Sequence, residues 1–163
     1  MAKVVFKVGD DVSTDTIYPG RFMATVLPSE TPQYAFADSP EFSRLVREKK
    51  IEPESVIVAG QNFGCGSSRE QAASCLKGPD LVVVARGFAR IFLQNSINLG
   101  LRTVICPEIE ASEGDELEIG PVSVANRTTG KTYAADPLPK ARQAIVDAGG
   151  LIPYTRKLLL ERK

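Results

Sequence analysis

The chain has 163 residues, of which 43% are hydrophobic and 25% charged, a composition typical of one compact domain with its own core. Twenty basic residues balance twenty acidic ones, which argues against electrostatic attraction to nucleic acid or to an anionic membrane surface. The N-terminus lacks the apolar run of a signal peptide, and no stretch approaches eighteen apolar residues. We therefore expect a single cytoplasmic domain over 1–163, with no membrane and no nucleic-acid partner.

The sequence contains no histidine, the residue that most often serves as general base or metal ligand. Its three cysteines, Cys65, Cys75 and Cys106, form no C-x-x-C pair and suit a reducing compartment. We expect free thiols, no metal site and no cofactor on this chain. A complete catalytic site then needs other residue types or another subunit.

In chain order, an alternating β-rich stretch predicts a first strand over 3–8, ended by a turn at 9–11. Residues 21–40 contain three prolines and are only moderately hydrophobic, which favours a mobile surface loop, with helical character possible around 33–37. Ser39 and Pro40 start a helix that runs to about Lys50. Residues 55–59 follow as a buried strand.

The middle of the chain alternates strands and helices. A Gly-rich loop and a helix over 67–77 lead to an apolar strand over 81–85, and a helix opened by Gly87 ends at Gly100 before a strand over 101–106. Three short antiparallel strands are predicted over 116–119, 122–125 and 131–134, followed by a terminal helix that includes 144–148. The predicted fold is α/β, a mixed sheet with parallel central strands flanked by helices.

The Gly-rich loop N-F-G-C-G-S-S-R-E at 62–70 has the features of an anion site. Gly64 and Gly66 let the backbone approach a ligand closely, and a helix start beside Ser67 and Ser68 directs N–H groups at it. The two hydroxyls and the planar fork of Arg69 add donors suited to a carboxylate or phosphate. An oxyanion, either a carboxylate or a phosphate, is therefore the expected ligand.

The loop has two other interpretations besides an anion site. Ser67 and Glu70 also match a capping box, in which the serine only caps the helix. A nucleotide site is disfavoured, because no lysine follows the glycines as in a P-loop and Arg69 occupies the place of the third glycine in G-x-G-x-x-G.

Three stretches together carry a more specific signal: D-V-S-T-D-T-I-Y-P-G at 11–20, N-F-G-C-G-S-S-R-E at 62–70 and A-R-G-F-A-R-I-F at 85–92. In this order and spacing, and with the closing A-G-G-L-I-P-Y at 148–154, the chain resembles the small subunits of 3-isopropylmalate dehydratase and homoaconitase. These subunits are equivalent to the swivelling last domain of aconitase. The resemblance covers nearly the whole chain and implies that fold, a β/β/α swivel domain.

The resemblance also implies a division of labour between two subunits. In the family, a large subunit carries a [4Fe–4S] cluster whose iron acts as Lewis acid on the hydroxyl of a hydroxy-di- or tricarboxylate, and the small subunit closes over it. Ser67 matches the catalytic base, Arg69 the carboxylate ligand and Ser68 an accessory donor. Asp15 matches the family's T-T-D or S-T-D motif and is expected near the substrate, where it orients its neighbours.

Substrate choice in the family depends on the loop after Pro-Gly, which here contains Phe22, Met23, Ala24 and Thr25. The homoaconitase type resembles Y-L-R-T, and its arginine pairs with the extra carboxylate of a tricarboxylate. Ala24 stands at that position, so the loop favours the alkyl group of isopropylmalate, with a methylated malate or homocitrate as alternatives. A further interpretation is that these residues only pack the loop against the domain.

The remaining motif residues leave other possibilities open. Arg86 and Arg90 are possible anion ligands, although arginines at a helix start more often pack their stems along the sheet. Two other functional classes also fit parts of the sequence: a free-standing anion- or nucleotide-binding module, and an assembly factor that retains the fold without catalysis.

Overall fold

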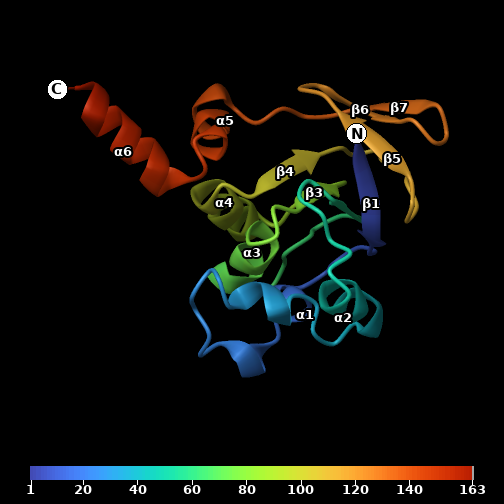
Figure 1. Ribbon diagram of the computed structural model, residues 1–163. Helices are drawn as coiled ribbons and strands as arrows, with labels where there is room; N and C mark the ends of the chain where they lie inside the picture. Colours follow the sequence, from blue (N-terminus) through green and yellow to red (C-terminus); the bar gives the residue numbers. More distant parts are fainter. Residues whose placement is uncertain (163) are drawn as a thin grey trace.

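A computed structural model describes residues 1–162 and contains one seven-stranded sheet, in the order β4-β3-β2-β1-β5-β6-β7 (Figure 1). The parallel half of the sheet consists of β1 (Ala2–Lys7), β2 (Val56–Ala59), β3 (Val82–Ala85) and β4 (Arg102–Ile105). The antiparallel half consists of β5 (Glu116–Ile119), β6 (Ser123–Asn126) and β7 (Lys131–Ala134). Strand β1 joins the halves, because it pairs parallel with β2 and antiparallel with β5. The predicted mixed sheet with parallel central strands is confirmed.

The central strands are buried on both faces. Every residue of β2 and β3 is buried, as expected for short Val-, Ile- and Ala-rich strands covered from both sides. Ile57 and Val83 face a core that includes Leu76 of the helical layer and Phe63 of the loop. Their neighbours in β2 and β3 face a second core, which contains Leu117 and Val124 of the antiparallel half.

The helices are α1 (Thr14–Ile17), α2 (Pro40–Arg47), α3 (Glu70–Lys77), α4 (Arg90–Leu99), α5 (Lys140–Asp147) and α6 (Leu151–Glu161). Three predicted helix boundaries were wrong. Helix α2 ends three residues early, in a turn where Lys49 has φ 51°. Helix α4 begins at Arg90 rather than Gly87, because Phe63 donates to the Gly87 carbonyl and accepts from the Ala89 amide, which keeps this stretch extended.

The third wrong boundary concerns α3, which begins at Glu70 rather than at Ser67. Arg69 is its N-cap residue and makes no side-chain cap hydrogen bond. The capping-box interpretation of Ser67 and Glu70 is therefore wrong, and the Ser67 side chain is not used to cap this helix.

Sequence reasoning also missed α1 and α6. Helix α6 contains Pro153, which is tolerated because it lies in the first turn, where its missing N–H would have no partner within the helix. No residue of α6 is buried, and Figure 1 shows this helix extending away from the sheet. No helix within residues 1–162 has the length and apolar character needed to cross a membrane.

The segment 21–40 has two different halves. Residues 26–30 are all exposed, whereas Thr31 and Phe36 are buried and Phe36 packs on Phe6 and Phe42. A short 3₁₀ helix spans Thr31–Tyr34, slightly earlier than the helical character expected around 33–37. The predicted mobility of the whole segment stays a prediction.

Candidate active site

The Gly-rich loop leaves the carboxyl end of β2 and is built on left-handed backbone. Asn62, Gly64 and Gly66 have φ values of 59°, 85° and 98°. A Cβ atom on Gly64 would lie 2.2 Å from the Phe92 ring, so only glycine fits between the loop and α4. The loop is therefore held directly against the first turn of α4.

A second segment, 11–14, runs alongside this loop and brings the first two sequence motifs together. The Gly64 amide donates to the Val12 carbonyl at 2.7 Å, and the Thr14 amide donates to the Cys65 carbonyl at 2.8 Å. Ser13 and Cys65 form a parallel bridge, and Ser13 also caps α1 by accepting from the Thr16 amide. These backbone bonds fix the position of α1 relative to Ser67.

The Ser67 side chain is exposed, and the hydroxyl of Thr14 is placed to orient it. Its Oγ lies 3.1 Å from Oγ1 of Thr14, a residue that is only 2% exposed. The buried threonine thus gives the exposed serine a fixed hydrogen-bond partner. Thr14 was not among the predicted site residues. Its position directly before Asp15 in the first motif could have indicated that it lies near the site.

Arg69 and Asp15, both predicted site residues, form an ion pair in the structure. Arg69 Nη1 donates to Asp15 Oδ1 at 2.5 Å and to the Tyr18 carbonyl at 3.1 Å, while the Gly20 amide donates to the same carboxylate oxygen at 2.9 Å. The hydrogen bond from Arg69, and then that from Gly20, lower the pKa of Asp15 below its ordinary value. The carboxylate stays charged and fixes the guanidinium, whose side chain is 20% exposed.

A shallow depression of about 510 Å³ lies beside these groups and is lined by Met23 and residues 67–71. The exposed Ser68 lies in this lining, and its carbonyl accepts a hydrogen bond of 3.4 Å from Asn95. Ser67, Ser68 and Arg69 therefore line the same small volume, and their side chains carry two hydroxyls and a guanidinium. This set of donors suits a carboxylate.

The four predicted specificity residues occupy different positions. Met23 lines the depression and is 41% exposed, and Ala24 is exposed next to it. The Phe22 ring instead stacks on Tyr34 at 4.1 Å, and the Thr25 carbonyl accepts a hydrogen bond from the Tyr18 hydroxyl. The packing interpretation therefore describes Phe22 and Thr25, and Met23 and Ala24 remain available to a ligand.

Arg86 and Arg90 do not line this depression. Arg86 donates to the Ile109 carbonyl at 3.2 Å, and Arg90 is the exposed first residue of α4.

The three cysteines are free and lie apart in different surroundings. Burial raises the pKa of the Cys75 thiol and raises that of Cys106 to about 11, and Cys65 is partly buried in the loop. Within residues 1–162, no three His, Cys, Asp or Glu side chains gather as a possible metal site.

Comparisons with known proteins identify the family of the chain. The family model of the aconitase C-terminal domain matches residues 21–108. The chain is 47% identical to the 3-isopropylmalate dehydratase small subunit of Methanosarcina mazei, over 96% of this chain and 97% of that protein. It is 42% identical to the isopropylmalate/citramalate isomerase small subunit of Methanocaldococcus jannaschii, over 96% and 94%.

A solved structure gives the same result at the level of the fold. The crystal structure of 3-isopropylmalate dehydratase from Methanocaldococcus jannaschii matches with a TM-score of 0.87 and 37% identity, over 98% of this chain and 95% of that one. The swivel-domain fold implied by the sequence resemblance is confirmed. The chain therefore belongs to the family of 3-isopropylmalate dehydratase small subunits, which share the aconitase C-terminal domain.

Proposed function

We propose that this chain is the small subunit of a two-subunit hydro-lyase that dehydrates and rehydrates an alkylmalate. The interconversion of 2-isopropylmalate and 3-isopropylmalate, a step of leucine biosynthesis, fits best. The observation that carries the proposal is the placement of Ser67 and Arg69 on one exposed depression, each held by a partner from α1. The names of the near-full-length relatives support it.

In the proposed reaction, Ser67 removes the proton from the carbon next to a substrate carboxylate. The new O–H bond forms on Ser67 Oγ, the electron pair of the broken C–H bond forms the alkene, and hydroxide leaves the neighbouring carbon. A serine hydroxyl is a poor base, so its ionised form must be stabilised by hydrogen bonds. Thr14, at 3.1 Å, is a donor placed for this.

Arg69 binds the substrate carboxylate in this proposal, and Ser68 is an accessory donor. The Asp15 carboxylate and the Tyr18 carbonyl hold one side of the guanidinium, whose remaining N–H groups can donate to a further acceptor. A pre-oriented arginine loses less freedom when it binds, which strengthens the contact with the substrate.

The departing hydroxide needs an electrophile. The family's [4Fe–4S] cluster supplies Lewis-acid chemistry when bound, and the cysteines of this chain do not fit it, because Cys75 is buried in the helical core and Cys106 in the other core. We therefore assign the cluster to a large partner subunit, and we place the complex in the cytoplasm, where free thiols persist.

Met23 and Ala24 favour an alkyl group over an extra carboxylate at the side of the depression. The arginine expected of a homoaconitase-type loop is replaced here by Ala24, and Met23 is apolar and flexible. A relative named for both isopropylmalate and citramalate is consistent with either alkyl group. Homocitrate and dimethylmalate are the alternatives to be assayed.

The test is reconstitution with a large subunit that carries the cluster. We expect the purified chain to be inactive alone and Ser67→Ala to reduce kcat by about 10³-fold with little change in KM. Ser68→Ala, one residue away and also exposed, is the matched control and should lose far less. Turnover by the isolated chain would overturn the two-subunit proposal, and full turnover of the Ser67→Ala complex would instead indicate a non-catalytic subunit.

A further inference from the structure

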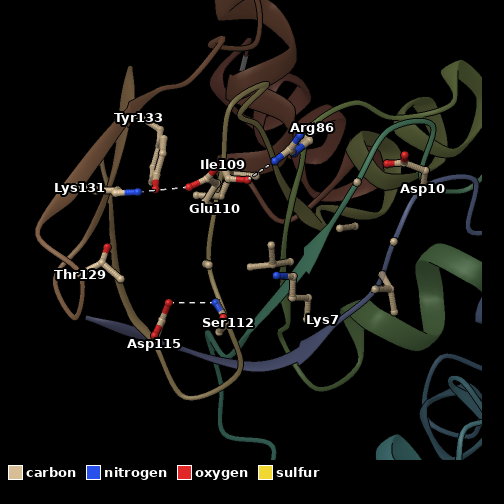
Figure 2. A pocket seen from close by; sticks show the side chains of 16 residues that line it. Lys7, Asp10, Arg86, Ile109, Glu110, Ser112, Asp115, Thr129, Lys131 and Tyr133 are labelled. Carbon is tan, nitrogen blue, oxygen red and sulfur yellow. Dashed lines mark hydrogen bonds and ion pairs between the residues drawn. The ribbon is translucent and has the colours of Figure 1, made fainter.

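A second cavity, of about 570 Å³, opens at the carboxyl ends of the parallel strands (Figure 2). One side is formed by the ends of β1 and β2 and by Arg86 after β3, and the other by residues 109–112 and by β7. Neither Ser67 nor Arg69 lines it. In open α/β sheets, ligands bind beyond the carboxyl ends of the strands, so this cavity has the position of a ligand site.

The charged groups of the cavity are unequally paired. Three carboxylates are engaged: Glu110 with Lys131 at 3.4 Å, Asp10 with the Gln61 amide at 2.7 Å, and Asp115 with Ser112 and Asn126 at 2.9 and 2.8 Å. By contrast, Lys7 has no ion pair within residues 1–162, and Arg86 uses one guanidinium nitrogen on the Ile109 carbonyl. Three acids thus face three cations in the cavity, and among the cations Lys7 and Arg86 retain donors that no group in the described part of the chain uses.

A buried hydroxyl supports the same conclusion independently. The Tyr133 hydroxyl oxygen is shielded from solvent and has no hydrogen-bond partner among residues 1–162. Leaving a buried phenol hydroxyl unpaired is unfavourable, and an acceptor supplied by a ligand removes that penalty. Figure 2 shows Tyr133 on the β7 side of the cavity, across from Arg86 and Lys7.

The wall between these polar groups is apolar, with Val8, Val58, Ile109 and Ala111 among its residues. Inorganic phosphate would leave this surface uncovered, whereas an acid with a short alkyl chain would cover it. We propose that the cavity binds a small carboxylate with a branched apolar body, through Lys7 and Arg86, with Tyr133 as a further donor. This site is separate from the proposed hydro-lyase site and does not depend on it.

The cavity shares a structural element with the candidate active site. Asp10 lines the cavity and accepts from the Gln61 amide, one residue before the Gly-rich loop, and the next residue, Asp11, accepts from the Asn62 side chain at 2.9 Å. A ligand in the cavity therefore contacts the segment that holds the start of the loop.

The experiment is a ¹H–¹⁵N NMR titration of the full chain with 3-methylbutanoate. We expect saturable shifts at the amides of Gly60, Arg86, Ala111 and Lys131, with a Kd below about 1 mM. The neutral 3-methylbutanamide and inorganic phosphate should each bind at least tenfold more weakly. These probes separate the contribution of the charge from that of the apolar body.

Four variants complete the test. Lys7→Gln and Arg86→Gln should each weaken binding about tenfold, and Tyr133→Phe about threefold. Lys7 is exposed and makes no side-chain bond, so Lys7→Gln keeps the test valid if Arg86→Gln disturbs Ile109. Arg142→Gln, an exposed charge change on α5, is the control and should bind like the parent chain.

Two results would overturn the proposal. One is a set of linear, non-saturating shifts, or equal binding by Lys7→Gln and the parent chain. The other is a set of shifts confined to residues 66–71 and abolished by Arg69→Ala, which would place the carboxylate in the candidate active site instead.

Discussion

The Gly-rich loop 62–69 and the neighbouring segment 21–30 border the same depression but are held in different ways. The loop is fixed by backbone bonds to segment 11–14 and by the close packing of Gly64 on Phe92. The segment 21–30 is mostly exposed, and near the depression it is tied to α3 by a bond of 3.4 Å from Gln71 to the Met23 carbonyl. The groups proposed for the reaction are thus held by several bonds, whereas Met23 and Ala24, the two selectivity residues next to the depression, have exposed side chains.

This difference indicates that substitutions can change the rate of the reaction and the choice of substrate separately. A proton-transfer base must keep its geometry within a narrow range, which backbone bonds and a buried threonine provide. An exposed side chain such as Ala24 can be replaced with little effect on the fold. Substitutions in the two regions should therefore have different kinetic signatures.

After that of Ser67→Ala, the largest effect is expected for Arg69→Ala in the reconstituted complex. Loss of the guanidinium removes the proposed carboxylate contact and leaves Asp15 without its partner, so kcat/KM should fall by about 10² to 10³-fold. Steady-state kinetics with isopropylmalate measures this. Arg90→Ala, an exposed arginine outside the depression, is the control, and an equal loss in both variants would mean that Arg69 has no special role.

A smaller effect is expected for Thr14→Val, which keeps the shape of the side chain but removes the hydroxyl beside Ser67. We expect kcat to fall about 10- to 30-fold with KM nearly constant, because the hydrogen bond acts on the ionised serine rather than on bound substrate. Thr14→Ser should restore most of the rate. If Thr14→Val changes only thermal stability, the threonine is part of the core and does not position the serine.

The sequence predicted much of the site because glycines, donors and arginine lie together in one short stretch. Ser67, Ser68 and Arg69 became candidates in this way, and the resemblance added Asp15. The start of α3 was misplaced because a capping box has the same local pattern as this loop. The role of Thr14 depends on a contact between residues 53 positions apart, which no local pattern contains.

The fold was predictable to a similar extent. Continuous apolar runs such as 81–85 identified the parallel strands, because a short run of this kind is typical of a strand that is buried on both faces. The pairing of β1 with both β2 and β5 was not predictable, because strand order depends on long-range packing. Helix α6 was missed because Pro153 resembles a helix breaker until the helix start is known.

A selectivity change is expected for Ala24→Arg. An added guanidinium beside the depression should lower kcat/KM for isopropylmalate about tenfold and raise it for homocitrate, because it attracts an extra carboxylate and displaces an alkyl group. Competition between the two substrates in one reaction measures the ratio directly. Ala24→Gln, similar in length but neutral, is the matched control, and an equal shift in both variants would indicate size rather than charge.

The smallest effect concerns the ionisation of Asp15. The hydrogen bond from Arg69 lowers the pKa of this carboxyl below 3.8, so the pair contributes its stability above that pH and loses it as the pH falls through the lowered pKa. Because Asp15 is exposed, solvent screens the pair and its contribution to the free energy of unfolding should be slight. An NMR titration of the Asp15 carboxyl carbon should show the lowered pKa, and Arg69→Ala should return it toward 3.8. An unchanged pKa in that variant would mean that Gly20 alone holds the carboxylate, and that the link between α1 and the Gly-rich loop is weaker than the ion pair suggests.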